Sequence, residues 1–212
     1  MKRLFLALDL PPETRQSLAD AVSWMRAFED RVKVVPAENY HVTLKFLGPT
    51  AEERIGPLLA ALEREARAMV PLDLRLEGWG VFPEKGHPNV FWAGVTPVDA
   101  ALPLFEECES ALEPLGFARD TRGFHPHVTL ARTGTQNAPA EFLKKWKALG
   151  LLKGPAEIRA ESITLYESLS GPRGPVYRVV GVWGWRGEGG RGPVSRIKKF
   201  NLLRGIQSAG FF

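Results

Sequence analysis

The sequence predicts an α+β fold, in which mainly antiparallel sheets are flanked by helices. Short apolar and β-branched segments alternate with segments whose apolar residues recur at helical spacing. Neighbouring strand segments are joined by short turns or by a single helix, which favours antiparallel pairing over a doubly wound parallel sheet. None of the predicted strands is followed by a glycine-rich phosphate loop.

In the first half of the chain, proline or glycine bounds the strands and an apolar repeat marks the helices. Paired prolines after the first strand open a helix with one apolar face, and a β-branched segment then ends at the next proline. The following strand is stopped by Gly48 and Pro49. The expected elements are a strand at 3–10, a helix at 12–28, strands at 32–35 and 40–47, a helix at 52–69, and strands at 72–82 and 90–95.

The second half continues the same alternation and ends in a hairpin, whose connection at 170–175 is made of turn-forming residues. We assign residues 1–186 to a single domain and residues 187–212 to a basic, glycine-rich tail that is expected to be flexible. Apolar residues at helical spacing in the tail leave a short helix, docked on the body or on RNA, as the alternative. The expected elements are a helix at 100–115, a strand at 124–131, a helix at 139–149, and a hairpin that pairs 158–169 with 176–185.

Charge and cysteine content limit the function classes. The tail holds five basic residues and one acidic residue, so it carries the whole net charge of +4 and the body is formally neutral. A nucleic-acid site must therefore be local. No apolar run approaches the roughly 20 residues of a membrane helix, so no membrane partner is expected. The single Cys108 excludes an intrachain disulfide; we expect it to be a buried small apolar residue, and the protein to be a cytoplasmic monomer.

The segment His-Val-Thr-Leu occurs twice, at residues 41–44 and 127–130, in a chain with four histidines. An identical second copy has a chance on the order of one in a thousand from ordinary residue usage. Both copies lie in predicted strands, where residues two apart share a face. Each histidine should therefore stand beside its own threonine, while valine and leucine point into the core. A two-lobed chain with pseudo-two-fold symmetry would bring both copies to one central cleft.

Two imidazoles in one site can act as a proton acceptor and a proton donor, because histidine titrates near neutral pH. Threonine hydroxyls and a nearby cation would hold a phosphate. Lys45 has the same parity as His41 and should lie at the cleft edge. Arg132 has the opposite parity to His127 and reaches the cleft only if the strand ends or bulges near residues 131–132.

The two motifs, within residues 39–48 and 124–132, resemble those of the two-histidine (2H) phosphoesterase superfamily, and most of all its RNA 2',3'-cyclic phosphodiesterase family, also called 2'-5' RNA ligase. The similarity extends over about residues 2–184 and includes the segments 3–11, 80–83, 91–94 and 165–168. It implies a bilobal α+β fold and hydrolysis of RNA 2',3'-cyclic phosphate ends to a 2'-phosphate, without a metal or other cofactor. RNA ends, such as those of tRNA fragments, would be the partner.

The resemblance further implies that His41 protonates the leaving 3'-oxygen and that His127 activates water. It also favours Arg132, together with Thr43 and Thr129, as the group that binds the phosphate. By the same parity argument, the flanking aromatic residues Tyr40 and Phe46 point into the core, and Phe124 is undecided. His125 and His87 are expected outside the catalytic pair, and no acidic residues stand at metal-ligand spacing beside the motifs.

Three other functions remain open. The same site would also catalyse the reverse reaction, 2'-5' RNA ligation. It would equally suit a phosphodiesterase that acts on small cyclic nucleotides. A binder of RNA ends without turnover is the third alternative, which the presence of both motifs disfavours.

Overall fold

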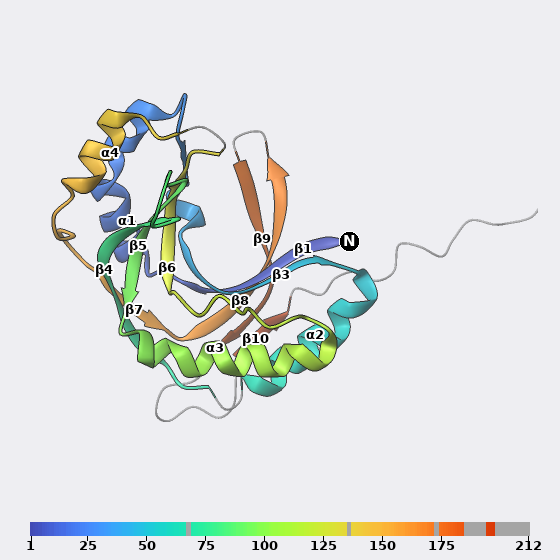
Figure 1. Cartoon of the computed structure of the whole chain (residues 1–212). Helices are drawn as coiled ribbons and strands as arrows, with labels where there is room; N and C mark the ends of the chain where they lie inside the picture. Colours follow the sequence, from blue (N-terminus) through green and yellow to red (C-terminus); the bar gives the residue numbers. More distant parts are fainter. Residues whose placement is uncertain (67–68, 135–136, 172–173, 185–193, 198–212) are drawn as a thin grey trace, which may run out of the picture.

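The protein is described from a computed structural model, which places residues 1–66, 69–134, 137–171, 174–184 and 194–197 (Figure 1). Within these ranges every strand pair is antiparallel, and helices flank the sheet, which confirms the α+β class. The strands are β1 (Lys2–Asp9), β2 (Lys33–Val34), β3 (His41–Thr50), β4 (Leu72–Phe82), β5 (Val90–Thr96), β6 (His127–Arg132), β7 (Glu157–Ala160), β8 (Ser162–Gly171), β9 (Gly174–Gly184) and β10 (Val194–Ile197). The helices are α1 (Pro12–Ala21), α2 (Glu52–Glu65), α3 (Val98–Leu112) and α4 (Ala140–Lys147).

The strands form one curled sheet in the order β10-β9-β8-β1-β3-β6-β5-β4-β7, with β2 beside β6. The half that contains β3 and the half that contains β6 are joined through the pair Val42 and Val128. Both valine side chains are fully buried. This junction lies in the middle of the strand order, so the two motifs meet where the two halves of the sheet meet.

Helices cover both halves of the sheet, and α3 packs on strands of both, namely β3, β4 and β5 (Figure 1). Around β5, the rings of Trp24 and Phe28 pack on Phe142 of α4, and Phe142 in turn contacts Phe91. Helices α2 and α3 lie side by side, and α3 buries Leu112. Helix α1 follows β1 in the chain but packs against the half of the sheet that contains β6, where Thr14 donates a hydrogen bond to the carbonyl oxygen of Glu157 in β7. This helix therefore connects the two halves.

Several predicted elements differ in detail. The strand predicted at 124–131 begins only at His127, and the helix predicted at 52–69 ends at Glu65. Strand β3 continues through Gly48 and Pro49, because both residues pair with β1. The helix predicted at 12–28 is α1 followed by a 3₁₀ helix, Ser23–Phe28. The strand predicted at 158–169 is divided at Glu161 into β7, which pairs with β4, and β8, which pairs with β1 and β9. The curl of the sheet brings its β7 edge close to β8, which no local pattern signals.

In the predicted tail, the described residues Val194–Ile197 pair with β9 as β10. The remaining tail, including the stretch where a helix was the alternative, lies outside the described residues. Among the helices that are described, none is long and apolar enough to cross a membrane.

Candidate active site

The bridge between β3 and β6 brings the two His-Val-Thr-Leu motifs next to each other. Val42 and Val128 are paired and buried, and successive side chains of a strand point to opposite faces of the sheet. The residues on either side of this pair therefore share the other face. They are His41, Thr43, His127 and Thr129, and each is partly exposed. The structure thus gathers the four predicted side chains of the two motifs on one face of the sheet, which we call the histidine face.

A β-bulge places Arg132 on the histidine face as well. Trp92 of β5 pairs with Thr129, whereas the adjacent Phe91 pairs with Ala131, so β6 carries one extra residue at Leu130. An extra residue reverses the facing of every side chain after it. Arg132 is consequently exposed, while Leu130 and Ala131 are both buried. The bulge required by the sequence argument is present.

An equivalent bulge in β3 overturns the prediction for Lys45. Ala7 of β1 pairs with Thr43 and the preceding Leu6 pairs with Lys45, so the extra residue is Leu44. Lys45 therefore faces away from the histidines. Its ammonium group is buried and lies 2.7 Å from both carboxylate oxygens of Glu109 on α3.

The same bulge affects the flanking aromatic residues. Phe46 was expected in the core, but the reversal turns it outward, and 65% of its surface is exposed. Tyr40 precedes the bulge and is buried as expected; burial raises its pKa to about 12. Phe124 is half-buried, and its ring stacks on Phe105.

Backbone carbonyls fix the orientation of both imidazoles in the same way. His41 Nδ1 lies 2.7 Å from the carbonyl oxygen of Asn39, and His127 Nδ1 lies 2.6 Å from that of His125. A carbonyl only accepts hydrogen bonds, so each Nδ1 must carry its hydrogen and donate it. In the neutral rings each Nε2 then lacks a hydrogen and can accept one, and Nε2 of His41 accepts a hydrogen bond from the Thr43 hydroxyl at 3.1 Å. His125 has an exposed side chain and orients the His127 ring through its backbone carbonyl.

The surroundings lower the pKa of both histidines. For each, burial is the largest cause, because a low-dielectric environment disfavours the imidazolium. The guanidinium of Arg132 lowers the pKa of both histidines further. A positive charge on His127 also lowers the pKa of His41, because the two rings are close. Arg132 therefore acts electrostatically on both rings, which is consistent with its place on the histidine face.

Asp9 distinguishes the two histidines, and the sequence reasoning missed it. Its position on β1 pairs with His41, and its carboxylate raises the pKa of that histidine against the larger effect of burial. Its two oxygens accept hydrogen bonds from Thr164 at 2.7 Å and Tyr166 at 2.5 Å. The corresponding neighbour of His127 on β5 is Gly94, which has no side chain. His41 therefore has a neighbouring carboxylate that favours its charged form, and His127 has none at the paired strand position.

Aromatic side chains surround both imidazoles, and the sequence reasoning missed this arrangement too. Around His41, the ring centroids of Phe5 and Tyr177 lie 4.9 Å and 5.3 Å away. Around His127, those of Phe82 and Trp92 lie 5.2 Å and 5.7 Å away. These rings come from strands far from the motifs in sequence.

Other candidate groups are placed elsewhere. Among the described residues, no group of three or more histidine, cysteine, aspartate or glutamate side chains is arranged to hold a metal. Cys108 is buried in α3, where burial raises its pKa to about 12, in keeping with an apolar role. His87 is exposed.

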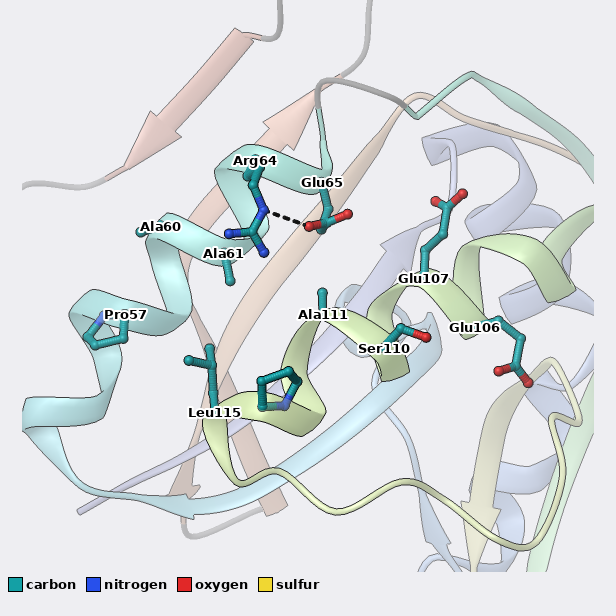
Figure 2. A pocket seen from close by; sticks show the side chains of 11 residues that line it. Pro57, Ala60, Ala61, Arg64, Glu65, Glu106, Glu107, Ser110, Ala111 and Leu115 are labelled. Atoms are coloured by element: carbon teal, nitrogen blue, oxygen red, sulfur yellow. Dashed lines mark hydrogen bonds and ion pairs between the residues drawn. The ribbon is translucent and has the colours of Figure 1, made fainter.

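A groove of about 570 Å³ lies between α2 and α3 (Figure 2). Its walls consist of small apolar residues together with Arg64, Glu65, Glu106 and Glu107, and Arg64 pairs with Glu65. Neither motif histidine lines it. The groove is therefore separate from the histidine face.

Comparisons with known proteins agree with this geometry. The sequence profile of the 2'-5' RNA ligase superfamily matches residues 10–172. A Thermus thermophilus protein named RNA 2',3'-cyclic phosphodiesterase is 37% identical over 195 residues, which cover 89% of this chain and 93% of that protein. A Thermotoga maritima protein of the same name is 29% identical over 84% of this chain and 92% of its own length.

Two solved structures share the fold. The crystal structure of Thermus thermophilus TT0787 superposes with a TM-score of 0.74 at 35% identity, over 88% of this chain and 99% of that one. The structure of E. coli LigT with 3'-AMP superposes with a TM-score of 0.63 at 25% identity, over 86% and 97%. Together with the profile match, these similarities show that the chain belongs to the 2'-5' RNA ligase superfamily.

Proposed function

We propose that the protein hydrolyses 2',3'-cyclic phosphate ends of RNA and leaves a 2'-phosphate. The observation that carries this proposal is the pairing of β3 with β6, which brings two histidines and Arg132 to one face of the sheet. In both histidines Nδ1 donates to a backbone carbonyl, so Nε2 is the atom that exchanges a proton. Relatives named RNA 2',3'-cyclic phosphodiesterase support the reaction. The LigT structure with 3'-AMP supports a ribonucleotide as ligand.

His127 is the general base of the proposed reaction. Its Nε2 takes a proton from water as the water oxygen forms a bond to phosphorus. Its lowered pKa keeps the ring neutral, and thus able to accept a proton, at neutral pH. No carboxylate on the paired strand position favours its charged form, since that position is Gly94.

His41 is the general acid. The bond from phosphorus to the 3'-oxygen breaks, and Nε2–H of His41 donates a proton to the departing oxygen. Burial lowers the pKa of His41 as it does that of His127, but only His41 has a carboxylate, that of Asp9, at its paired strand position to raise the pKa in part, which supports the assignment. After one turnover the base holds a proton and the acid lacks one, so exchange with water restores the pair. Each step of proton transfer contributes roughly 10²- to 10⁴-fold to the rate.

Thr43, Thr129 and Arg132 bind the non-bridging phosphate oxygens. Threonine hydroxyls donate hydrogen bonds without adding charge, and a guanidinium donates in a geometry that matches two phosphate oxygens. Arg132 follows the bulge in β6 and so extends from the histidine face, where its positive charge offsets that of the anion.

The test is a product analysis. An oligoribonucleotide that ends in a 2',3'-cyclic phosphate is incubated with the protein and a chelator, and the position of the phosphate on the product is determined. We expect a 2'-phosphate, and loss of most activity in His41→Ala and in His127→Ala. The matched control is His87→Ala, because His87 is an exposed histidine outside the site.

Other outcomes identify the alternatives. Loss of activity with the chelator would indicate a metal enzyme. A 3'-phosphate product would show that the 2'-oxygen, and not the 3'-oxygen, is the leaving group. Joined RNA ends would indicate ligation, turnover of cyclic mononucleotides alone would indicate a small-nucleotide enzyme, and binding without product would indicate an RNA-end binder. Rates within tenfold of the original after either histidine substitution would refute the assigned roles.

A further inference from the structure

Phe46 is an exposed aromatic residue on the histidine face, next to the proposed phosphate site. The bulge at Leu44 reverses the facing of β3, so Phe46 returns to the side of the sheet occupied by Thr43. The ring is 65% exposed, so one of its faces is open to a ligand. Its inner edge is supported by Phe5, whose ring centroid is 6.2 Å away.

Phe5 connects this residue to the catalytic pair. The centroid of the Phe5 ring lies 4.9 Å from that of His41 and 6.2 Å from that of Phe46. Along the strand, Phe46 is three residues beyond Thr43, which corresponds to at most about 10 Å. A nucleotide whose phosphate lies beside Thr43 therefore has Phe46 within the reach of a nucleobase.

A cavity opens beside the exposed ring. It has a volume of about 280 Å³ and is lined by Phe46, Lys45 and residues 118–122. This volume is below that of whole-ligand pockets, so it suits one part of a larger ligand. Arg122 stands at the rim with most of its side chain exposed, and Asp120 holds its guanidinium through two hydrogen bonds. Phe46 and Arg122 both line this cavity, and aromatic rings and guanidinium planes are the groups on which unpaired RNA bases stack.

Phe46 and Arg132 hold equivalent places in the two motifs. Each is the fifth residue after its histidine, and each follows a bulge that turns it to the histidine face. The repeat has thus acquired different chemistry at one position: a cation on β6 and an aromatic ring on β3. The cation suits a phosphate and the ring suits a base, which are the two parts of one nucleotide.

We propose that Phe46 is a stacking platform for a nucleobase at the RNA end, with the cavity beside it receiving that base. This proposal rests on the proposed function, because the cyclic phosphate sets the position of the base. Stacking accepts any base, since each has an aromatic face, so the platform favours RNA ends over phosphates that lack a base without selecting a sequence.

The test compares Phe46→Ala with the original protein on three substrates. The first is a short oligoribonucleotide ending in a 2',3'-cyclic phosphate, the second is the same oligonucleotide with its last two bases removed, and the third is ribose 2',3'-cyclic phosphate. We expect Phe46→Ala to lower kcat/KM for the first substrate by roughly 5- to 150-fold, and to leave the other two within about twofold. Phe46→Trp should retain the activity on the first substrate.

Leu151→Ala is the matched control, because Leu151 is also an exposed apolar residue and lies outside both motifs. An equal loss on all three substrates would overturn the proposal, because Phe46 would then act on the catalytic groups themselves. No loss on the base-bearing substrate would overturn it as well. Absence of turnover by the original protein on every substrate is a different result, which contradicts the proposed function.

Discussion

Asp9 lies opposite His41 in the β1–β3 pair and is held by hydrogen bonds from Thr164 and Tyr166. Both of its oxygens are thereby fixed, so its negative charge stays beside the imidazole. No such charge occupies the position of Gly94 beside His127. The two halves of the site are similar in their motifs and differ in this neighbour, so a carboxylate raises the pKa of His41, against the larger lowering by burial, and none does so at the paired position of His127.

Replacing Asp9 by asparagine should reduce the fraction of His41 that is protonated. The carboxylate raises the pKa of His41, so its removal lowers that pKa further. The alkaline limb of the rate profile, where the acid loses its proton, should move to lower pH. The measurement is kcat/KM against pH, fitted with apparent values that belong to the coupled pair.

The control for this variant is Asp73→Asn, because Asp73 is an exposed carboxylate that pairs with Arg159 away from the site. An unchanged alkaline limb in Asp9→Asn would show that the carboxylate does not act on the proton of His41. A uniform loss of rate at every pH would point to a role in folding instead.

Arg132 should affect both the rate and the pH profile. Its charge lowers the pKa of both histidines, so Arg132→Ala should move both limbs to higher pH. Loss of the guanidinium should also lower kcat/KM by roughly 10²- to 10³-fold, if it binds charge that develops on the phosphate. Arg132→Lys keeps the charge but loses the paired donors, so it should lower the rate while moving the limbs little.

Arg64→Ala serves as the control, since Arg64 is an exposed arginine in the groove between α2 and α3. If both limbs of the pH profile stay in place in Arg132→Ala, then Arg132 does not lower the pKa of the two histidines. A rate that Arg132→Lys restores fully would contradict the need for paired donors.

The sequence predicted the fold class and the shared face of the motif side chains, because strand alternation is a local rule. It failed for Lys45 and Phe46 because Leu44 is an extra residue, and a bulge is a property of the strand pair. The same limit left Arg132 conditional until the pairing of β5 with β6 was known.

Long-range pairing explains the other residues that sequence reasoning missed. Asp9 is far from His41 along the chain, and only the register of β1 against β3 makes them neighbours. Tyr177 reaches His41 from β9, near the other end of the chain. The division of the predicted strand at Glu161 likewise follows from the curl of the whole sheet.

Cys108 should resist alkylation in the folded protein. Its thiol is buried, and burial raises its pKa to about 12, so little of the reactive thiolate exists at neutral pH. The number of thiols modified by iodoacetamide, measured by mass spectrometry, should be near zero in buffer and one per chain in denaturant. Rapid modification of the native protein would show that α3 opens readily.

Stability should decrease in mild acid because of the two motif histidines. Their pKa values are lowered in the folded state, so below about pH 6.5 the unfolded chain binds more protons than the folded protein. This part of the stability is complete above that pH and is lost as the pH falls towards the folded values. The measurement is urea unfolding at a series of pH values. The free energy of unfolding should fall less steeply with falling pH in the double variant His41→Gln with His127→Gln. An equal slope would contradict the burial of these rings.

The buried pair of Lys45 and Glu109 should matter for stability in a non-additive way. Both side chains are almost fully buried, and Lys45 also donates to the carbonyl oxygen of Ala118. Lys45→Met leaves the Glu109 carboxylate buried without its partner, which should lower the free energy of unfolding by about 3–5 kcal/mol. Adding Glu109→Leu removes that unpaired charge, so the double variant should be more stable than Lys45→Met alone. The measurement is urea unfolding of the original protein, both single variants and the double variant. If the two single substitutions lower the free energy of unfolding by amounts that add up in the double variant, the two side chains are not coupled. A small loss in Lys45→Met would show that the Lys45 ammonium is not buried between β3 and α3.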